Sequence, residues 1–188
     1  MKELSLNILD VTKNSVTAGA DTIELTLSLS TDGWLSFSVK DNGCGMSEDV
    51  RKRAIDPFYT TRTTRRVGMG LPLLKLAAEQ TGGELKIASS TEVGKSGTEL
   101  CATFYTKSID FMPIGDIIST VCVLISGSPE VRFIFKDITP EGTVSLDTVE
   151  LREVLGDEIS LAHPEVVSWI RGYLAEQYAE REGHSSHL

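Results

Sequence analysis

The sequence predicts a two-layer α/β (α+β) sandwich, in which helices cover one mixed sheet, with a small α+β extension at the C-terminus. Helical and strand-like periodicities follow one another along the 188 residues. The strand patterns alternate between apolar and polar residues, which indicates half-buried strands. The hydrophobic content of 40% is sufficient for a core. We expect one main domain over residues 1–106, an extension packed on it over 107–183, and a polar tail over 184–188.

The first predicted helix covers residues 2 to about 18. Its apolar stripes contain Leu4, Leu6, Ile8, Leu9, Val11, Ser15 and Val16. The polar residues Asn7, Asp10 and Asn14 are spaced by three and four, and we expect them to share a different face. Gly19 is placed as the C-terminal cap.

Two strands follow the first helix. Apolar residues alternate with polar ones over residues 22–30, and again from Leu35 through Phe37 to Val39. The turn "TDGW" between the two runs predicts a hairpin. Asp41 therefore lies where the second strand ends.

The rest of the chain alternates in the same way. Ser47 is predicted as a helix N-cap, and residues 56–70, "DPFYTTRTTRRVGMG", as a loop. Further helices are predicted at 71–81, with Pro72 in the first turn, near 115–126, at 149–155 and at 164–180; further strands are predicted at 84–89, 98–105, 131–137 and 143–146. The last helix has its apolar face at Val166, Val167, Ile170 and Leu174, and residues 181–188 are expected to fray.

Composition excludes several classes of protein. The net charge of −9 and the pI of about 4.8 argue against non-specific binding to nucleic acid or anionic membranes. Cys44, Cys101 and Cys122 lie far apart and form neither a disulfide framework nor a zinc motif. No signal peptide and no apolar run of about 20 residues occurs. We expect a reduced, cytoplasmic protein.

The stretch "DNGCGM" at the end of the second strand suggests a ligand site. An ionised carboxylate at Asp41 accepts hydrogen bonds without donating them, so an adenine amine is a natural partner. Gly43 and Gly45 would let a flat ring approach the backbone. The alternative is a plain Asn-Gly turn.

A second glycine cluster opens the helix at 71–81. Glycines such as Gly68 and Gly70 at a helix entrance free backbone N–H groups for an anion. Between the two clusters lies the only dense basic patch, formed by Arg62, Arg65 and Arg66 beside the hydroxyls of Thr60 and Thr61. This patch could clamp a triphosphate, or it could be a solvated loop.

The first helix offers the metal chemistry. The side-chain oxygen of Asn14 suits Mg²⁺, which keeps several waters and bridges phosphates. Asp10, one turn earlier, could hold and deprotonate a water aimed at the γ-phosphorus. The alternative is that both residues merely lie on a solvent-exposed face.

Together these motifs resemble a known superfamily. "NILDVTKNSVTAGAD", "DNGCGM", "DPFYTT" and "GMGLPLL" are similar, in order and spacing, to the N, G1, F and G2 boxes of the GHKL ATPases, which have the Bergerat ATP-binding fold. This superfamily includes gyrase B subunits, heat-shock chaperones, histidine kinases and MutL proteins. The resemblance spans about residues 1–106, and "SGSPEVRFIFKD" with "LREVLGDE" is similar to a later segment of MutL-like proteins.

The resemblance implies a role for individual residues. It implies Asn14 on Mg²⁺, Asp41 on the adenine amine with Thr98 nearby, and Asp10 as the catalytic base. The implied ATP-binding residues are Asn14, Asp41, Gly43, Gly45, Met46, Thr61, Arg62, Gly68, Gly70, Leu71 and Thr98. The stretch "DPFYTTRTTRRV" would be a short ATP lid.

The function expected from this resemblance is Mg²⁺-dependent ATP binding with slow hydrolysis. Hydrolytic members carry Glu where this chain has Asp10, which shortens the arm by one methylene. One alternative is a protein kinase acting in trans on a partner's Ser or His, because His163, His184 and His187 do not lie in a phosphoacceptor hairpin. The other is a non-catalytic, nucleotide-gated binding switch. We expect a protein partner or a homodimer, and neither nucleic acid nor membrane.

Overall fold

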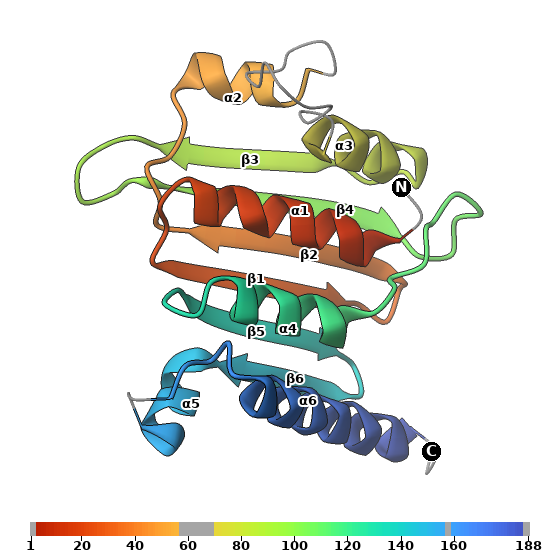
Figure 1. The fold of residues 1–188 in the computed structure, drawn as a ribbon. Coiled ribbons are helices and arrows are strands. Elements are labelled where there is room, and N and C mark those ends of the chain that lie inside the picture. Colours follow the sequence, from red (N-terminus) through yellow and green to blue (C-terminus); the bar gives the residue numbers. More distant parts are fainter. Residues whose placement is uncertain (1–2, 57–69, 157–158, 186–188) are drawn as a thin grey trace.

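The computed structural model describes residues 3–56, 70–156 and 159–185, and these form a sheet with one layer of helices on it (Figure 1). The strands are β1 (Thr22–Leu29), β2 (Trp34–Asp41), β3 (Leu85–Ser90), β4 (Gly97–Tyr105), β5 (Arg132–Thr139) and β6 (Gly142–Asp147). The helices are α1 (Leu4–Thr17), α2 (Glu48–Ala54), α3 (Gly70–Gln80), α4 (Ile117–Gly127), α5 (Thr148–Leu155) and α6 (Pro164–Ser185). The predicted two-layer α+β architecture is confirmed.

The six strands form one mixed sheet in the order β3-β4-β2-β1-β5-β6. All neighbours are antiparallel except β1 and β5, which run parallel. The strands of the C-terminal extension therefore continue the sheet of the N-terminal region through the β1–β5 pair. The domain boundary at residues 106 and 107 stays a prediction.

The alternation along the strands explains the two layers. On β1, Ile23, Leu25 and Leu27 are buried under the helices, whereas Thr22 and Glu24 on the other face are half-buried. An antiparallel pair with one covered face shows this pattern, because successive side chains point to opposite sides. The core lies between the sheet and helices α1, α3, α4 and α6; its largest fully buried side chains include Phe37, Phe104 and Phe135.

Side chains cover the backbone groups of both edge strands. Arg51 on α2 donates to the carbonyl oxygen of Ile87 on β3 at 3.0 Å. Gln177 on α6 accepts from the backbone N–H of Ser145 on β6 and donates to its carbonyl oxygen, both at 3.0 Å. Such contacts hinder the addition of another chain to a sheet edge.

Two predictions about helix faces and ends are wrong. Leu6 is 46% exposed, and Asn7 is buried instead of sharing the solvent face of Asp10 and Asn14. The reason is a non-local contact, because the segment 111–114 crosses the start of α1 and covers Asn7, whose amide donates to Met112 Sδ at 3.4 Å.

The final helix also extends further than predicted. α6 continues to Ser185, although fraying was expected from residue 181. Arg181 pairs with Asp137 on β5 at 3.3 Å and lies over the ring of Tyr178. The Tyr178 hydroxyl donates to the same carboxylate at 2.7 Å. These contacts with β5 hold the last turns of α6 in place.

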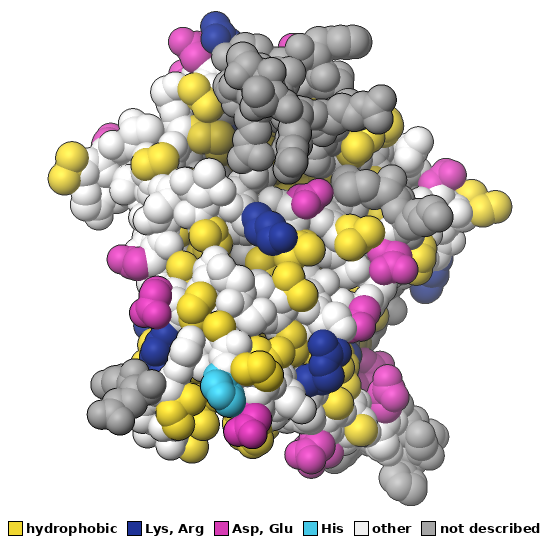
Figure 2. Space-filling view, in the orientation of Figure 1, with side chains coloured by type: hydrophobic (Ala, Val, Ile, Leu, Met, Phe, Trp, Pro, Cys, Tyr) yellow, Lys and Arg dark blue, Asp and Glu magenta, His cyan; other side chains and the backbone are white. Residues whose placement is uncertain are grey.

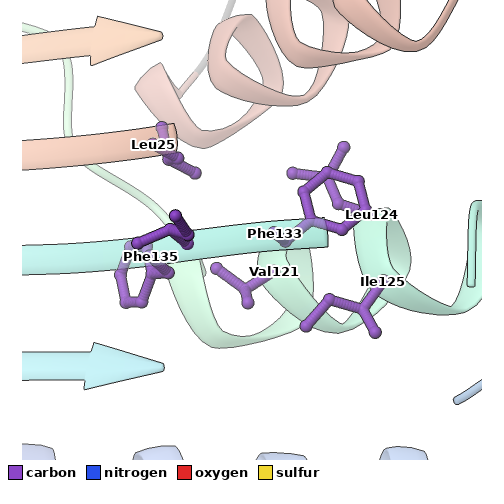
Figure 3. A pocket seen from close by; sticks show the side chains of 7 residues that line it. Leu25, Val121, Leu124, Ile125, Phe133 and Phe135 are labelled. Atoms are coloured by element: carbon purple, nitrogen blue, oxygen red, sulfur yellow. The ribbon is translucent and has the colours of Figure 1, made fainter. Parts of the chain in front are cut away.

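A small apolar cavity lies between α4 and strands β1 and β5 (Figure 3). Its lining consists of Leu25, Val121, Leu124, Ile125, Phe133, Ile134 and Phe135. Because every lining residue is apolar, this cavity is a packing gap in the core. Among the described residues, no helix is both long enough and apolar enough to cross a membrane.

Candidate functional site

Asp41 is the last residue of β2, the strand between β1 and β4. It is opposite Ile23 on one side and Thr98 on the other. Its side chain follows the parity of the buried residues of β2, so it projects from the end of the sheet toward α1. The β1–β2 hairpin and the packing of α1 on the sheet together bring this carboxylate close to α1.

Three donors hold the Asp41 carboxylate. Oδ1 accepts from the backbone N–H groups of Gly43 at 3.0 Å and Thr98 at 3.2 Å. Oδ2 accepts from the hydroxyl of Ser15 on α1 at 2.6 Å. A carboxylate has about four acceptor positions, so one position on Oδ2 remains for a further donor. The arrangement orients this carboxylate to receive an N–H group.

The loop after Asp41 passes close to other backbone segments. A Cβ on Gly45 would lie 1.9 Å from the carbonyl oxygen of Ser90, and the φ of Gly45 is +70°. A Cβ on Gly97 would lie 2.1 Å from the carbonyl oxygen of Asp41. Both positions therefore need glycine for the protein's own packing. This structural reason for Gly45 was absent from the sequence analysis, and the contact of Gly43 and Gly45 with a base stays a prediction.

Ser89 links this loop to the sheet. Its hydroxyl accepts from the backbone N–H of Met46 at 2.7 Å and donates to the carbonyl oxygen of Gly97 at 2.9 Å. The hydroxyl of Thr98 lies 2.9 Å from it. Met46 and Thr98, both predicted site residues, are thus brought together through a residue that the sequence analysis missed. The available signal was a serine pair at the end of a predicted strand.

Asn42 fixes the other side of the loop. Its Oδ1 accepts from the backbone N–H groups of Asp21 at 3.1 Å and Thr22 at 3.0 Å, and its Nδ2 donates to Asp21 at 2.6 Å. The hydrogen bond from Asn42 lowers the pKa of Asp21 below its usual value. Asn42 therefore ties the loop to the start of β1 and is more than a turn residue.

Helix α1 connects the carboxylate with the start of α3. Asp10 and Asn14 are exposed one turn apart, and Ser15, next to Asn14, holds Asp41. A Cβ on Gly70, the first residue of α3, would lie 4.0 Å from that of Asp10. The half-buried Leu71 follows Gly70 and packs against the core. The structure thus places one glycine-containing segment at the C-terminal end of α1, where a Cβ on Gly43 would lie 2.9 Å from the carbonyl oxygen of Ala18, and the other beside Asp10.

Several predicted residues lie outside the described residues. These are Thr60, Thr61, Arg62, Arg65, Arg66 and Gly68. Among the described residues, no group of three His, Cys, Asp or Glu side chains could hold a metal ion. Asn14 forms no side-chain hydrogen bond within the described part of the chain, so its oxygen is available as one ligand to a hard cation.

Comparison with known proteins identifies a family. The sequence pattern of the family described as histidine kinase-, DNA gyrase B- and HSP90-like ATPase matches residues 1–108. The chain is 30% identical over 98 residues to the signal transduction histidine-protein kinase AtoS of Escherichia coli, covering 52% of this chain and 16% of that protein. It is 36% identical over 97 residues to sporulation kinase E of Bacillus subtilis, covering 50% and 12%. The chain thus matches less than a fifth of either relative.

Solved structures show the same fold over more of the chain. The Aquifex aeolicus MutL ATPase domain complexed with ADP superposes with a TM-score of 0.52 at 15% identity, covering 82% of this chain and 69% of that chain. The N-terminal domain of a DNA repair protein superposes with a TM-score of 0.56 at 17% identity, covering 78% and 52%. Both superpositions cover more of the chain than the 108 residues that match the family.

Proposed function

The chain belongs to the family of histidine kinase-, DNA gyrase B- and HSP90-like ATPases, and on that premise we propose that it binds ATP with Mg²⁺ and hydrolyses it slowly. The observation that carries the proposal is the Asp41 carboxylate, held by three donors with one acceptor position left over. The MutL ATPase domain that shares the fold was solved with ADP, which supports a purine nucleotide as the ligand.

Asp41 would select adenine over guanine. Its Oδ2 accepts from the exocyclic amine of adenine, and an ionised carboxylate has no proton to donate. Guanine has a carbonyl oxygen at that position of the ring, so two acceptors would face each other. Leaving such groups unpaired in a closed site costs affinity. Gly43, Gly45, Met46 and Thr98 would line the base and sugar beside this carboxylate.

The phosphates would lie between α1 and α3. The N–H groups of Gly70 and Leu71 at the start of α3 suit an anion. Asn14 would hold Mg²⁺ through its side-chain oxygen, and the metal would neutralise charge on the phosphates. Thr61, Arg62 and Gly68 are assigned to the phosphates from the sequence pattern alone.

Asp10 would act as the base in hydrolysis. It accepts the proton of a water whose oxygen attacks the γ-phosphorus, while the bond from that phosphorus to the bridging oxygen breaks and ADP leaves. Its exposed position beside Gly70 is compatible with this role. The arm of Asp is one methylene shorter than that of Glu, so the water would be held less well and turnover would be slow.

Calorimetric titration with MgATP tests the binding site. Asp41→Asn places a donor where an acceptor is required, and the dissociation constant should rise about 10- to 100-fold. Discrimination between ATP and GTP should fall in the same variant. Asp32→Asn is the matched control, because Asp32 is an exposed aspartate in the turn at the other end of the β1–β2 hairpin. Unchanged ATP affinity in Asp41→Asn contradicts the proposal.

A phosphate-release assay tests the catalytic step. Asp10→Asn should keep its ATP affinity and lose phosphate release, whereas Asn14→Ala should lose the Mg²⁺ dependence of binding. Rapid single-turnover hydrolysis by the unmodified protein would contradict slow hydrolysis. Equal phosphate release by Asp10→Asn would remove Asp10 from the mechanism.

The sequence relatives favour a second candidate, phosphoryl transfer to a partner protein, because both named relatives are kinases. Asp10 would then accept the proton of a partner's side chain instead of a water. Transfer of label from γ-labelled ATP to a co-purified partner distinguishes this function from hydrolysis. Nucleotide-dependent partner binding that survives Asp10→Asn, without turnover, would instead indicate a non-catalytic switch.

A further inference from the structure

Negative charge is concentrated at the C-terminal end of the chain. Residues 140–188 contain ten acidic and three basic residues, a net charge of −7, whereas residues 1–139 have a net charge of −2. This acidic part includes β6, α5 and α6. Figure 2 shows acidic side chains gathered over α6 at the lower end of the molecule. This acidic part of the chain thus lies at the β6 edge of the sheet, and β1 and β5 separate β6 from β2, which holds Asp41.

The exposed face of α6 carries a stacked aromatic pair. The rings of Trp169 and Tyr173 lie 5.2 Å apart at an interplanar angle of 7°. Trp169 is 49% exposed and Tyr173 39% exposed, although Ile170 and Leu174 on another face of the helix are fully buried. Large exposed aromatic side chains on a well-packed helix are typical of contact surfaces. This face has room for a partner.

Two carboxylates flank the aromatic pair. Glu165 and Glu176 fall on the same side of α6, one turn before Trp169 and about one turn after Tyr173. Neither side chain forms an ion pair or hydrogen bond within the described ranges. Asp137 and Asp147, by contrast, are paired with Arg181 and Arg132. We refer to Glu165, Trp169, Tyr173 and Glu176 as the α6 face.

We propose that the α6 face binds an arginine-rich segment of a partner protein. A guanidinium group stacks on an indole ring and forms bidentate hydrogen bonds with carboxylates. It can therefore contact both the aromatic pair and the two glutamates of this face. A second copy of the chain fits poorly, because a two-fold contact would place the same acidic residues against one another. Nucleic acid and anionic lipid are repelled by the same charge.

Trp169 allows a direct binding measurement. The chain has two tryptophans, so Trp34→Phe leaves Trp169 as the single reporter. We expect a peptide of alternating Arg and Ala residues to change the fluorescence of Trp169 saturably. An otherwise identical peptide with Lys in place of Arg should bind more weakly, and one with Glu in place of Arg should have no effect. Raising the salt concentration should weaken the binding. Absence of saturable binding, or equal binding of the Glu-Ala peptide, overturns the proposal.

Variants locate the contact, with calorimetry as the readout. Trp169→Ala should weaken binding of the Arg-Ala peptide about tenfold, and Glu165→Gln with Glu176→Gln about threefold. The matched control is Trp34→Ala, because Trp34 is 41% exposed and lies 5.3 Å from Tyr105 on the open face of the sheet. Equal effects of Trp34→Ala and Trp169→Ala overturn the proposal. The proposal is also overturned if sedimentation analysis finds a dimer of the unmodified protein that Trp169→Ala abolishes.

Discussion

Around Asp41, backbone passes close to backbone and polar groups make the contacts, whereas around α4, α6 and β5 side chains fill the space between the elements. Gly45 and Gly97 each lie where an added Cβ would come within about 2 Å of a carbonyl oxygen, at 1.9 Å and 2.1 Å. In the other region, Phe133, Phe135 and Leu174 are buried among apolar neighbours.

The two regions should therefore tolerate different kinds of substitution. A site built from glycine backbone is sensitive to any added atom, because the neighbouring carbonyl cannot move without breaking a strand pair. A region built from large side chains is sensitive to removed atoms, because the surroundings collapse only partly into the space. The following predictions, from the largest effect to the smallest, test this contrast.

Phe135→Ala should have the largest effect on stability. It removes a fully buried ring beside an existing apolar gap (Figure 3), so the free energy of unfolding should fall by about 3–5 kcal/mol. ATP affinity of the folded protein should stay unchanged, because Phe135 is on β5 and strand β1 separates it from β2, which carries Asp41. Urea denaturation and calorimetry measure the two quantities. A tenfold loss of affinity in the folded variant would show that the two regions are coupled.

Gly45→Ala should affect both stability and binding. The new Cβ would lie 1.9 Å from the carbonyl oxygen of Ser90 at a positive φ, so unfolding free energy should fall by about 3 kcal/mol or more and ATP binding should be lost.

Gly94→Ala is the control for this change. Gly94 also has a positive φ, +78°, but a Cβ there would meet nothing within 4 Å. Its cost should be about 1 kcal/mol, from backbone conformation alone. Equal urea midpoints for Gly45→Ala and Gly94→Ala would refute the steric argument.

Ser15→Ala should weaken the orientation of Asp41. It removes the 2.6 Å donor to Oδ2, so the ATP dissociation constant should rise about three- to tenfold and stability should fall by about 1 kcal/mol. Ser5→Ala on the same helix is a matched control, because Ser5 is also buried and does not contact Asp41. Calorimetry that finds the same affinity loss in both would assign the effect to general damage of α1.

The smallest expected effect concerns acid stability. The hydrogen bond from Arg132 lowers the pKa of Asp147, the N-cap of α5, below its usual value of 3.8. The group therefore stabilises the fold above about pH 4 and loses this contribution as the pH falls through its lowered pKa. Asp147→Asn should remove that dependence. The difference in unfolding free energy between the variant and the unmodified protein should therefore become smaller as the pH falls from about 5 to about 3, that is, from about one unit above the pKa of a free Asp to about one unit below it.

The magnitude for Asp147 should be about 1 kcal/mol at most, because Arg132 is 43% exposed and the pair is screened by solvent. Urea unfolding at several pH values measures it. Asp110→Asn serves as control, since Asp110 is exposed and forms no side-chain hydrogen bond in the described ranges. A gap that stays constant across this pH range, or that shrinks equally in Asp110→Asn, would contradict the assignment.

The same two regions differ in their relation to other proteins. Sequence likeness to the histidine kinases covers about half of the chain, whereas the fold shared with the MutL ATPase domain covers 82% of it. The structural reason is the parallel pair of β1 and β5, which makes the extension part of the same sheet. The similarity in fold therefore includes more of the chain than the sequence likeness to these two kinases covers.

Local sequence patterns were sufficient to predict the helices and strands and the position of the Asp41 carboxylate. Apolar periodicity predicted each strand and, apart from α2, each helix that the structure describes; α2, which buries no residue, was indicated only by Ser47 as its N-cap. The glycines marked the loop after β2, and the sequence carries further local signals. It also placed Asp41 at a strand end and Ser47 as an N-cap, which accepts from Val50. These features depend on residues close together in the chain, where local geometry decides the outcome.

The contacts around that carboxylate depend instead on how distant segments pack together. Ser15 reaches Asp41 from 26 residues away, and Ser89 reaches Met46 from 43 residues away. Thr98, which the resemblance placed near Asp41, donates to it through its backbone N–H from 57 residues away. The burial of Asn7 and the parallel pairing of β5 with β1 also depend on distant segments. The physical reason is that a local pattern fixes how a segment turns, whereas its neighbours in space are chosen by the packing of the whole chain.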